Sequence, residues 1–379
     1  MDFDFSDDQV QLRDAVRRWA DKSYSFERRR SIVKAGGWSA EAWGELAELG
    51  LTGLAVAPDH NGLGFGPVEA MVTMEELGRA LVVEPYAHVA LVASALLGWS
   101  RAELAGPWLE GIADGQARVV LAHQERQARY HLNHVFTRAV QAGGQWTLSG
   151  IKHVVPMGGE ACGYIVPARV SGSDADPAGI ALFLVRHDAA GLRRPAYPLQ
   201  DGSAASDLVL ADTPAEELLG AGPAYAALEH ALDIGIAALA AEAVGAMERV
   251  VELTAEYLNT RRQFGVPISS FQALRHRLAD MKMQLELARS MSYYATLKLG
   301  ELPDTRRRAL SQAKVQIGQS ARYVGQQAIQ LHGGIGVTDE YLVGHYFKRL
   351  TCIELSFGDT LHHLGEVAAR AHDTAGVFA

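Results

Sequence analysis

Four long helical segments near the C-terminal end constrain the fold of this chain more than any other feature. They carry apolar residues on alternating faces, as amphipathic helices do, and helices of this length pack stably as a four-helix bundle. A run of small side chains, Ala237–Ala246, lines the first helix and permits close approach by another helix or by a ring system. The predicted helices cover residues 224–259, 271–300, 305–332 and 340–372, the last with a break near Gly358.

The break between the first two helices combines cations, aromatic residues and turn residues. A helix ends at Arg261 and Arg262, the chain turns through Gly265 and Pro267, and a helix restarts at Phe271-Gln272. A guanidinium fork binds phosphate oxygens bidentately, so the corner suits a phosphorylated ligand. The structural alternative is that these arginines are ordinary cations, favoured by the dipole at a helix C-terminus.

A second break follows at residues 330–336, between the third and fourth helices. It contains Gly333-Gly334, and because neither residue has a Cβ, the backbone there can approach a ligand closely. A lone glycine pair ordinarily marks only the end of a helix. Its interest here comes from its position after the cationic corner.

The rest of the chain changes character twice. Residues 1–118 are predicted to be helical, with a capping box at Ser6 and a second helix capped by Ser39 and ending at Gly50. Residues 119–222 carry short β-prone runs separated by glycines, which predicts a small barrel or sandwich. We therefore predict an α+β multidomain chain: an N-terminal α-helical domain (1–118), a middle β domain (119–222) and a C-terminal four-helix bundle (223–379).

Composition narrows the possible partners. The net charge of −9 disfavours nonspecific binding to nucleic acid and to anionic membrane surfaces. Two short basic runs, 28–30 and 306–308, are expected to be solvated helix ends. Two cysteines suit a reducing compartment, and without a signal-peptide pattern or an 18-residue apolar window we expect a cytoplasmic chain with no membrane insertion. His131 and His134 have ligand-like spacing but no accompanying cluster, so no metal site is predicted.

The two breaks together resemble the signature segments of the acyl-CoA dehydrogenase family, and the helix–strand–helix order resembles that family's fold over essentially the whole chain. The resemblance implies an FAD-dependent oxidoreductase that converts an acyl-CoA to the trans-2-enoyl-CoA and passes electrons to an electron-transferring flavoprotein. In the family, the first segment holds the FAD of a neighbouring subunit. The residues implied to contact FAD are Arg261, Gln263, Phe264, Phe271, Gln272, Gln330, Gly333, Gly334 and Asp359.

Three further segments are similar to the small subunit of pimeloyl-CoA dehydrogenase, a heteromeric bacterial member of the family: His123–Tyr130, Pro198–Gly202 and His345–Leu350. The similarity implies a second acyl-CoA dehydrogenase-like subunit in an α2β2 heterotetramer, with a homotetramer as the alternative. It also implies a pimeloyl-CoA-like substrate. Related heteromeric enzymes take bulky ring or steroid acyl-CoA substrates, which the alanine-lined helix suits equally well.

Several residues that carry the family's chemistry are replaced. The triplet that usually begins with the catalytic glutamate falls on Phe357-Gly358-Asp359, and the family's other glutamate position falls on Gly235. The Gly-Ser-Asp loop that contacts flavin and substrate is missing from residues 122–130. One interpretation is that a partner subunit holds most of the flavin and that this chain completes the site.

Three carboxylates are candidates for the missing roles. Glu242 is the predicted base, because it lies two turns after Gly235 on roughly the same helix face, among alanines that would desolvate it. Its structural alternative is a buried acid bonded to a neighbouring helix. Asp359 is a second candidate base, as in relatives that oxidise nitroalkanes, and Asp233 matches the family acid that positions the CoA portion of the substrate.

Two other functions stay open. If none of these carboxylates is a base, the chain is expected to be a non-catalytic partner subunit that completes a flavin site in an α2β2 assembly. A flavin oxidase or monooxygenase related to the family is the third interpretation, and it rests only on Asp359.

Overall fold

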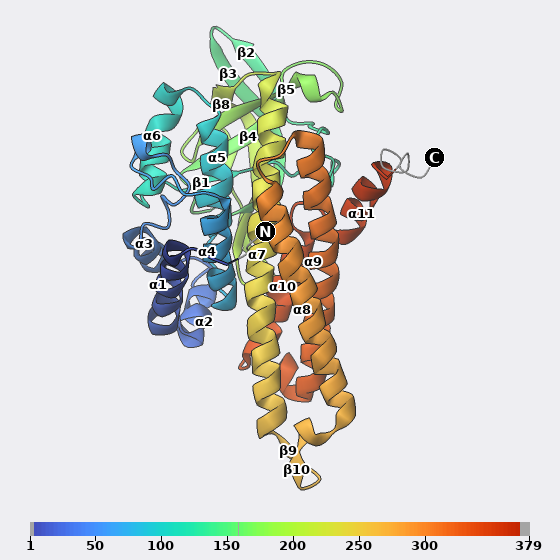
Figure 1. Cartoon of the computed structure of the whole chain (residues 1–379). Coiled ribbons are helices and arrows are strands. Elements are labelled where there is room, and N and C mark those ends of the chain that lie inside the picture. The colour runs from blue at the N-terminus through green and yellow to red at the C-terminus, as the bar shows by residue number, and fades with distance from the viewer. Residues whose placement is uncertain (1–3, 158, 372–379) are drawn as a thin grey trace. The chain divides into compact units, whose positions relative to one another are not determined.

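The computed structural model describes residues 4–157 and 159–371 (Figure 1). Contacts divide the chain into two compact units. We call residues 1–29, 67–82 and 236–379 the bundle unit, and residues 30–66 and 83–235 the barrel unit. The grouping follows contacts rather than chain order, so each unit draws on more than one stretch of sequence.

The barrel unit is built on an eight-stranded sheet. Strand β4 pairs with β2 and β5, and the series β2-β3-β8-β5 returns to β4, so five strands close into a barrel with β1 added beside β4. The predicted barrel or sandwich is therefore a barrel. The strands are β1 (Val119–Leu121), β2 (Arg138–Ala142), β3 (Gln145–Pro156), β4 (Gly163–Arg169), β5 (Ile180–Arg186), β6 (Leu192–Arg193), β7 (Ala196–Pro198) and β8 (Ala204–Leu219).

Short helices complete the barrel unit. Ser39 begins α3 as predicted, since its side-chain oxygen accepts from the backbone N–H of Ala42 at 3.2 Å. The helical elements are α3 (Ala40–Glu48), η1 (Pro58–His60), the π-helix η2 (Ala87–Ala93), α5 (Ser94–Gly98), α6 (Ala102–Ala113) and η3 (Pro177–Gly179). The first part of α7 (Pro223–Thr260) also belongs to this unit.

The bundle unit contains the long predicted helices. The capping box at Ser6 is present at the start of α1. Among the described residues, no helix combines the length and the apolar character needed to cross a membrane. The elements are α1 (Asp7–Ser23), α4 (Pro67–Arg79), the rest of α7, β9 (Arg262–Gln263), β10 (Val266–Pro267), η4 (Ile268–Ser270), α8 (Gln272–Lys298), α9 (Pro303–His332), η5 (Gly333–Val337), α10 (Leu342–Leu355) and α11 (Thr360–Ala369).

One helix, α2 (Phe26–Lys34), lies in the stretch predicted to be helical, but the sequence predicts no bounds for it, because its run of three arginines hides any apolar periodicity. The expectation that basic runs are solvated is wrong at two positions. Arg29 is only 2% exposed and donates from Nε to the Leu81 carbonyl at 2.9 Å, and Arg306 is 8% exposed. Burying a guanidinium costs less free energy when it donates to a carbonyl than when it has no acceptor.

Small residues bring α4 and α7 together within the bundle unit. A Cβ at Gly245 would lie 1.8 Å from the Glu75 carbonyl oxygen, and one at Gly78 would lie 2.1 Å from the Glu242 carbonyl oxygen. Glycine at both positions is therefore required by the close helix crossing. The crossing accounts for small side chains in this part of α7 by helix packing, the first of the two explanations for the alanine-rich run.

Candidate functional site

Both signature segments lie at one end of the bundle unit, where α7 and α9 end and α10 begins (Figure 1). Tyr257 stacks on His332 with ring centroids 4.5 Å apart, and Tyr341 packs against the same imidazole at 5.1 Å. His332 is 3% exposed, its Nδ1 donates to the Ala328 carbonyl at 2.8 Å, and burial lowers its pKa. A neutral aromatic cluster therefore joins the cationic corner to the glycine pair.

The cationic corner is a tight hairpin of β9 and β10. Phe264 and Gly265 form its turn with φ of 53° and 80°, which is the sign pattern of a type I′ turn. Arg262 stabilises the turn by donating from Nη2 to the Gly265 carbonyl at 3.0 Å. The turn presents Phe264 outward: its side chain is 91% exposed and meets Phe271 edge to face at 6.1 Å. A positive φ is uncommon for an aromatic residue, and the hairpin turn holds Phe264 in this conformation with its ring exposed.

Three polar side chains at this end are exposed and make no hydrogen bond or ion pair within residues 4–157 and 159–371: Arg261, Gln272 and Gln330. Gln263 differs, because its Nε2 donates to the Arg262 carbonyl at 2.8 Å. The backbone of Arg261 is fixed, since it donates to Tyr257 and accepts from Ile268, each at 2.9 Å. The corner thus holds a guanidinium on a rigid base with all of its donors available.

The glycine pair leaves open space beside these groups. Gly333 ends α9 with φ of 62°, a conformation that favours glycine at a helix C-terminus. Gly334 has no such requirement, and a Cβ built there would meet no atom within 4 Å. No contact in the described chain therefore explains glycine at position 334, and the space is available to a bound molecule.

These groups fit the FAD that the sequence resemblance implies. A guanidinium binds phosphate oxygens, exposed aromatic rings stack on flat heterocycles, and free amides accept or donate to their polar edges. The residues that fit FAD all lie at one end of the bundle unit: Arg261, Phe264, Phe271, Gln272, Gln330, Gly333 and Gly334.

The predicted base, Glu242, is bound by an arginine. It is 4% exposed, and its two oxygens accept from Nε and Nη2 of Arg349 on α10 at 2.5 and 2.7 Å. This bidentate pair corresponds to the structural alternative of an acid bonded to a neighbouring helix. Catalysis by Glu242 stays a prediction.

The turn between α10 and α11 holds the triplet at the family's usual glutamate position. Phe357 is 8% exposed with φ of 55°, and its carbonyl accepts from His363 Nε2 at 3.0 Å. Asp359 is the N-cap of α11, where its Oδ1 accepts from the backbone N–H of His362 at 2.8 Å. Asp359 therefore has a local capping role, and its predicted FAD contact stays a prediction.

Asp233 is buried on the part of α7 that belongs to the barrel unit, with 1% exposure. Nine residues separate it from Glu242 along the helix (233 to 242), and at 100° per residue that spacing places the two carboxylates on opposite faces. Their predicted roles therefore require separate tests.

A buried ion pair occupies the region in which the family's Gly-Ser-Asp loop is missing. Lys152 is fully buried and donates from Nζ to Glu125 Oε1 at 2.6 Å, and Thr137 donates to the same oxygen from its hydroxyl at 2.8 Å. Burial lowers the pKa of Lys152. Burial alone would raise the pKa of Glu125, but the positive charge of Lys152 holds that pKa below its usual value. Both charged groups are used within the barrel unit.

Two important residues gave no sequence signal of their role. Arg349 is 107 residues from its partner Glu242, so only the tertiary structure pairs them. Lys314 on α9 is 2% exposed and donates from Nζ to the carbonyls of Ile353 and Glu354 at 2.6 and 3.0 Å. Burial lowers the pKa of Lys314 to about 7. It positions the end of α10, directly before the Phe357 turn.

Comparisons with known proteins agree with this architecture. Residues 6–116 match the family model described as acyl-CoA dehydrogenase, N-terminal domain, and residues 224–372 match that described as acyl-CoA dehydrogenase, C-terminal domain. The chain is similar to "Probable acyl-CoA dehydrogenase YngJ" of Bacillus subtilis (strain 168), with 30% identity over 94% of this chain and 96% of that protein.

Two solved structures are also similar over nearly their full length. One is a variant of the Tcur3481-Tcur3483 steroid ACAD, with 30% identity, a TM-score of 0.88 and coverage of 97% of this chain and 99% of that one. The other is the ChsE4-ChsE5 complex of Mycobacterium tuberculosis, with 25% identity, a TM-score of 0.89 and coverage of 98% and 99%.

Proposed function

The chain belongs to the acyl-CoA dehydrogenase family, and from that premise we propose that it is an FAD-dependent subunit that dehydrogenates an acyl-CoA to its trans-2-enoyl-CoA. The observation that carries the proposal is the end of the bundle unit. There, a guanidinium with no hydrogen bond or ion pair in the described part of the chain, an outward phenylalanine and an open glycine backbone gather around one aromatic cluster. Electrons leave to an electron-transferring flavoprotein.

The residues of this end would hold the FAD. Arg261 would bind phosphate oxygens through its free fork, Phe264 and Phe271 would pack on the adenosine part, and Gln272 and Gln330 would hydrogen-bond to it. When bound, FAD supplies the hydride acceptor for oxidation of the acyl Cα–Cβ bond. The side chains extend outward from one bundle, which suits a flavin shared with a second subunit.

Removing the Arg261 charge tests this assignment. We expect Arg261→Gln to raise the Kd for FAD by about 10- to 100-fold, because it removes charge-assisted hydrogen bonds to phosphate. The matched control is Arg277→Gln, an equal change of charge on α8 at a side chain that contacts Gln327 at 3.3 Å. Flavin absorbance after dialysis measures both. Equal FAD occupancy in the two variants would argue against the assignment.

We further propose that a partner subunit supplies the proton acceptor for the substrate Cα. Each candidate carboxylate in this chain already has a partner: Arg349 binds both oxygens of Glu242, and the His362 N–H binds Asp359. Asp233 is also engaged and buried. In this proposal the chain is a half-site subunit, which means that it completes a flavin site in an α2β2 assembly while its partner supplies the base. This is the non-catalytic interpretation of the sequence.

The outer face of α8 supports an assembly with a second acyl-CoA dehydrogenase-like subunit. Met283, Leu287, Tyr294 and Leu297 are 53%, 44%, 36% and 51% exposed. Their spacings of four, seven and three residues place them in one stripe along the helix. An apolar stripe of this kind marks a protein interface. The similar Tcur3481-Tcur3483 and ChsE4-ChsE5 structures carry paired names, which favours a heteromeric assembly for this chain too.

The acyl group belongs to one of two classes, pimeloyl-CoA-like or bulky ring and steroid acyl-CoA. The similar steroid ACAD supports the second class. Turnover of pimeloyl-CoA and of a steroid-side-chain acyl-CoA by the assembled enzyme separates them. The measured ratio of kcat/KM values assigns the class.

A further inference from the structure

A polar cavity lies within the bundle unit. Its volume is about 290 Å³, and it lies among α1, α2, α4, α7 and α10. That size is at the small end of ligand pockets. Four guanidinium groups and two carboxylates line it: Arg17, Arg29, Arg79, Arg249, Asp21 and Glu76.

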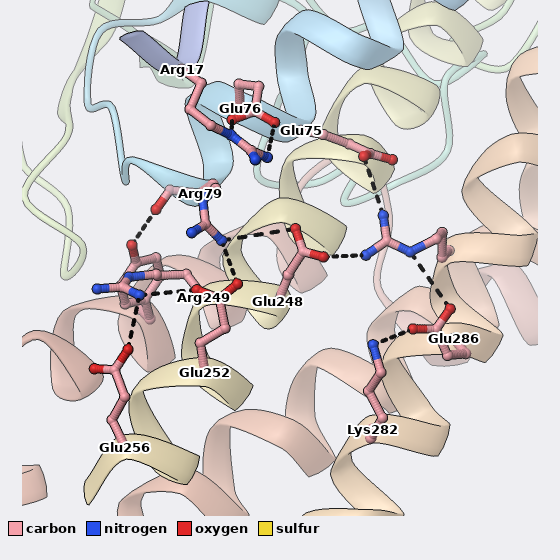
Figure 2. Close-up of polar contacts among 12 residues, drawn as sticks. Arg17, Glu75, Glu76, Arg79, Glu248, Arg249, Glu252, Glu256, Lys282 and Glu286 are labelled. Carbon is pink, nitrogen blue, oxygen red and sulfur yellow. Dashed lines mark hydrogen bonds and ion pairs between the residues drawn. The ribbon is translucent and has the colours of Figure 1, made fainter. Parts of the chain in front are cut away.

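Three of these arginines keep donors available. Arg17 uses Nε and Nη2 on the two oxygens of Glu76, at 2.9 and 2.6 Å. Arg79 and Arg249 each use Nη1 on Glu252, at 2.9 Å (Figure 2). Within the described part of the chain, the other guanidinium nitrogens of these three residues have no hydrogen-bond partner.

The charges that line the cavity do not balance. The side chains that face the cavity are four cations and two carboxylates, and three further carboxylates balance charge from behind its wall. Glu248, Glu252 and Glu256 hold Nη1 of Arg79 or Arg249 but do not line the cavity. A dianion inside the cavity would therefore meet the free sides of three arginines while their other sides stay paired.

The wall of the cavity is fixed before any ligand binds. Arg29 and Tyr346 are each 2% exposed. Arg29 donates to the Leu81 carbonyl at 2.9 Å, its Nη1 lies 3.2 Å from His345 Nδ1, and the Tyr346 hydroxyl donates to the Arg79 carbonyl. Groups held in this way lose little conformational entropy on binding.

We propose that this cavity binds a small dianionic oxyanion, of which inorganic phosphate is the simplest, through the free N–H groups of Arg17, Arg79 and Arg249. Guanidinium groups recognise phosphate and carboxylate oxygens by the same fork geometry. None of the residues that line the cavity is among those assigned to FAD or to the substrate.

Isothermal titration of the FAD-loaded protein, at constant ionic strength set with chloride, tests the proposal with inorganic phosphate and with pimelate. We expect saturable binding of one anion per chain. Arg249→Gln should raise the Kd by about tenfold or more, through loss of a charge-assisted hydrogen bond, and Arg17→Gln on another wall should do the same. The control is Arg289→Gln, because Arg289 joins the same ion-pair network through Glu75 and Glu248 but does not line the cavity.

Each outcome decides the proposal. Binding of phosphate alone identifies a phosphate ligand, and binding of pimelate alone identifies a dicarboxylate; both support the site. No saturable binding of either anion overturns it. A Kd that Arg289→Gln raises as much as Arg249→Gln also overturns it, since the anion would then respond to the network and not to the cavity.

Discussion

Replacing Glu242 by glutamine separates its two possible roles, base and structural acid. Both carboxylate oxygens of Glu242 accept from Arg349, and the side chain is 6% exposed. A glutamine keeps one oxygen for Arg349 and turns an NH2 group toward the second guanidinium nitrogen. The variant therefore breaks half of a bidentate contact and removes its negative charge, with almost no change in shape.

The cost follows from the burial of the pair. Removing one partner of a buried ion pair costs about 3–5 kcal/mol in the free energy of unfolding. Arg349 is 20% exposed and the glutamine oxygen still accepts one bond, so we expect the lower end, about 3 kcal/mol. The double variant Glu242→Met/Arg349→Met should be more stable than either single variant, because it removes both buried charges together.

Urea unfolding followed by circular dichroism gives the stability, and acyl-CoA turnover per folded enzyme gives the activity. A structural role predicts a lower free energy of unfolding for Glu242→Gln with turnover retained. Loss of a general base would instead lower turnover by about 10²- to 10⁴-fold. Full stability combined with such a loss would refute the structural role and restore Glu242 as the base.

Two further predictions concern the α4–α7 crossing. Gly245→Ala places a Cβ 1.8 Å from the Glu75 carbonyl oxygen, so we expect it to lower the free energy of unfolding in urea by about 2–3 kcal/mol. The control is Gly44→Ala, whose Cβ meets nothing within 4 Å and should cause no loss of stability. Equal unfolding midpoints for the two variants would contradict the close crossing. Burial raises the pKa of Glu75 from 4.5 to about 7, so its stabilising contribution is complete below about pH 4.5 and is lost as the pH rises through about 7. Calorimetry should show the stability of the wild type falling relative to that of Glu75→Gln by up to about 3 kcal/mol over this range, because the other groups titrate in both proteins; parallel curves would show that Glu75 does not titrate there.

The sequence was sufficient for elements whose signals are local. The long helices of the bundle follow from amphipathic periodicity, and Ser6 and Ser39 cap helices through contacts only three residues away. The same reasoning set no bounds for α2 within the stretch predicted to be helical, because three consecutive arginines mask its period. It also misjudged Arg29, whose acceptor on Leu81 lies 52 residues away.

In the candidate site, too, the sequence identifies what depends on local signals and not what depends on contacts between distant segments. The residues of the cationic corner could be named from the sequence, but their availability could not, since it depends on which side chains other helices engage. Glu242 shows the limit. An acid among alanines is buried as predicted, yet the arginine that binds it comes from another helix 107 residues later, and no periodicity or spacing links the two.

The most direct test of the proposed half-site is an anaerobic visible spectrum of this chain, purified alone, before and after addition of pimeloyl-CoA or a steroid acyl-CoA. If a partner subunit supplies the proton acceptor, any flavin absorbance of the chain alone stays unchanged by either substrate and bleaches only after the second subunit is added. Bleaching of the flavin by substrate in the chain alone would contradict this and would show that the chain carries its own base.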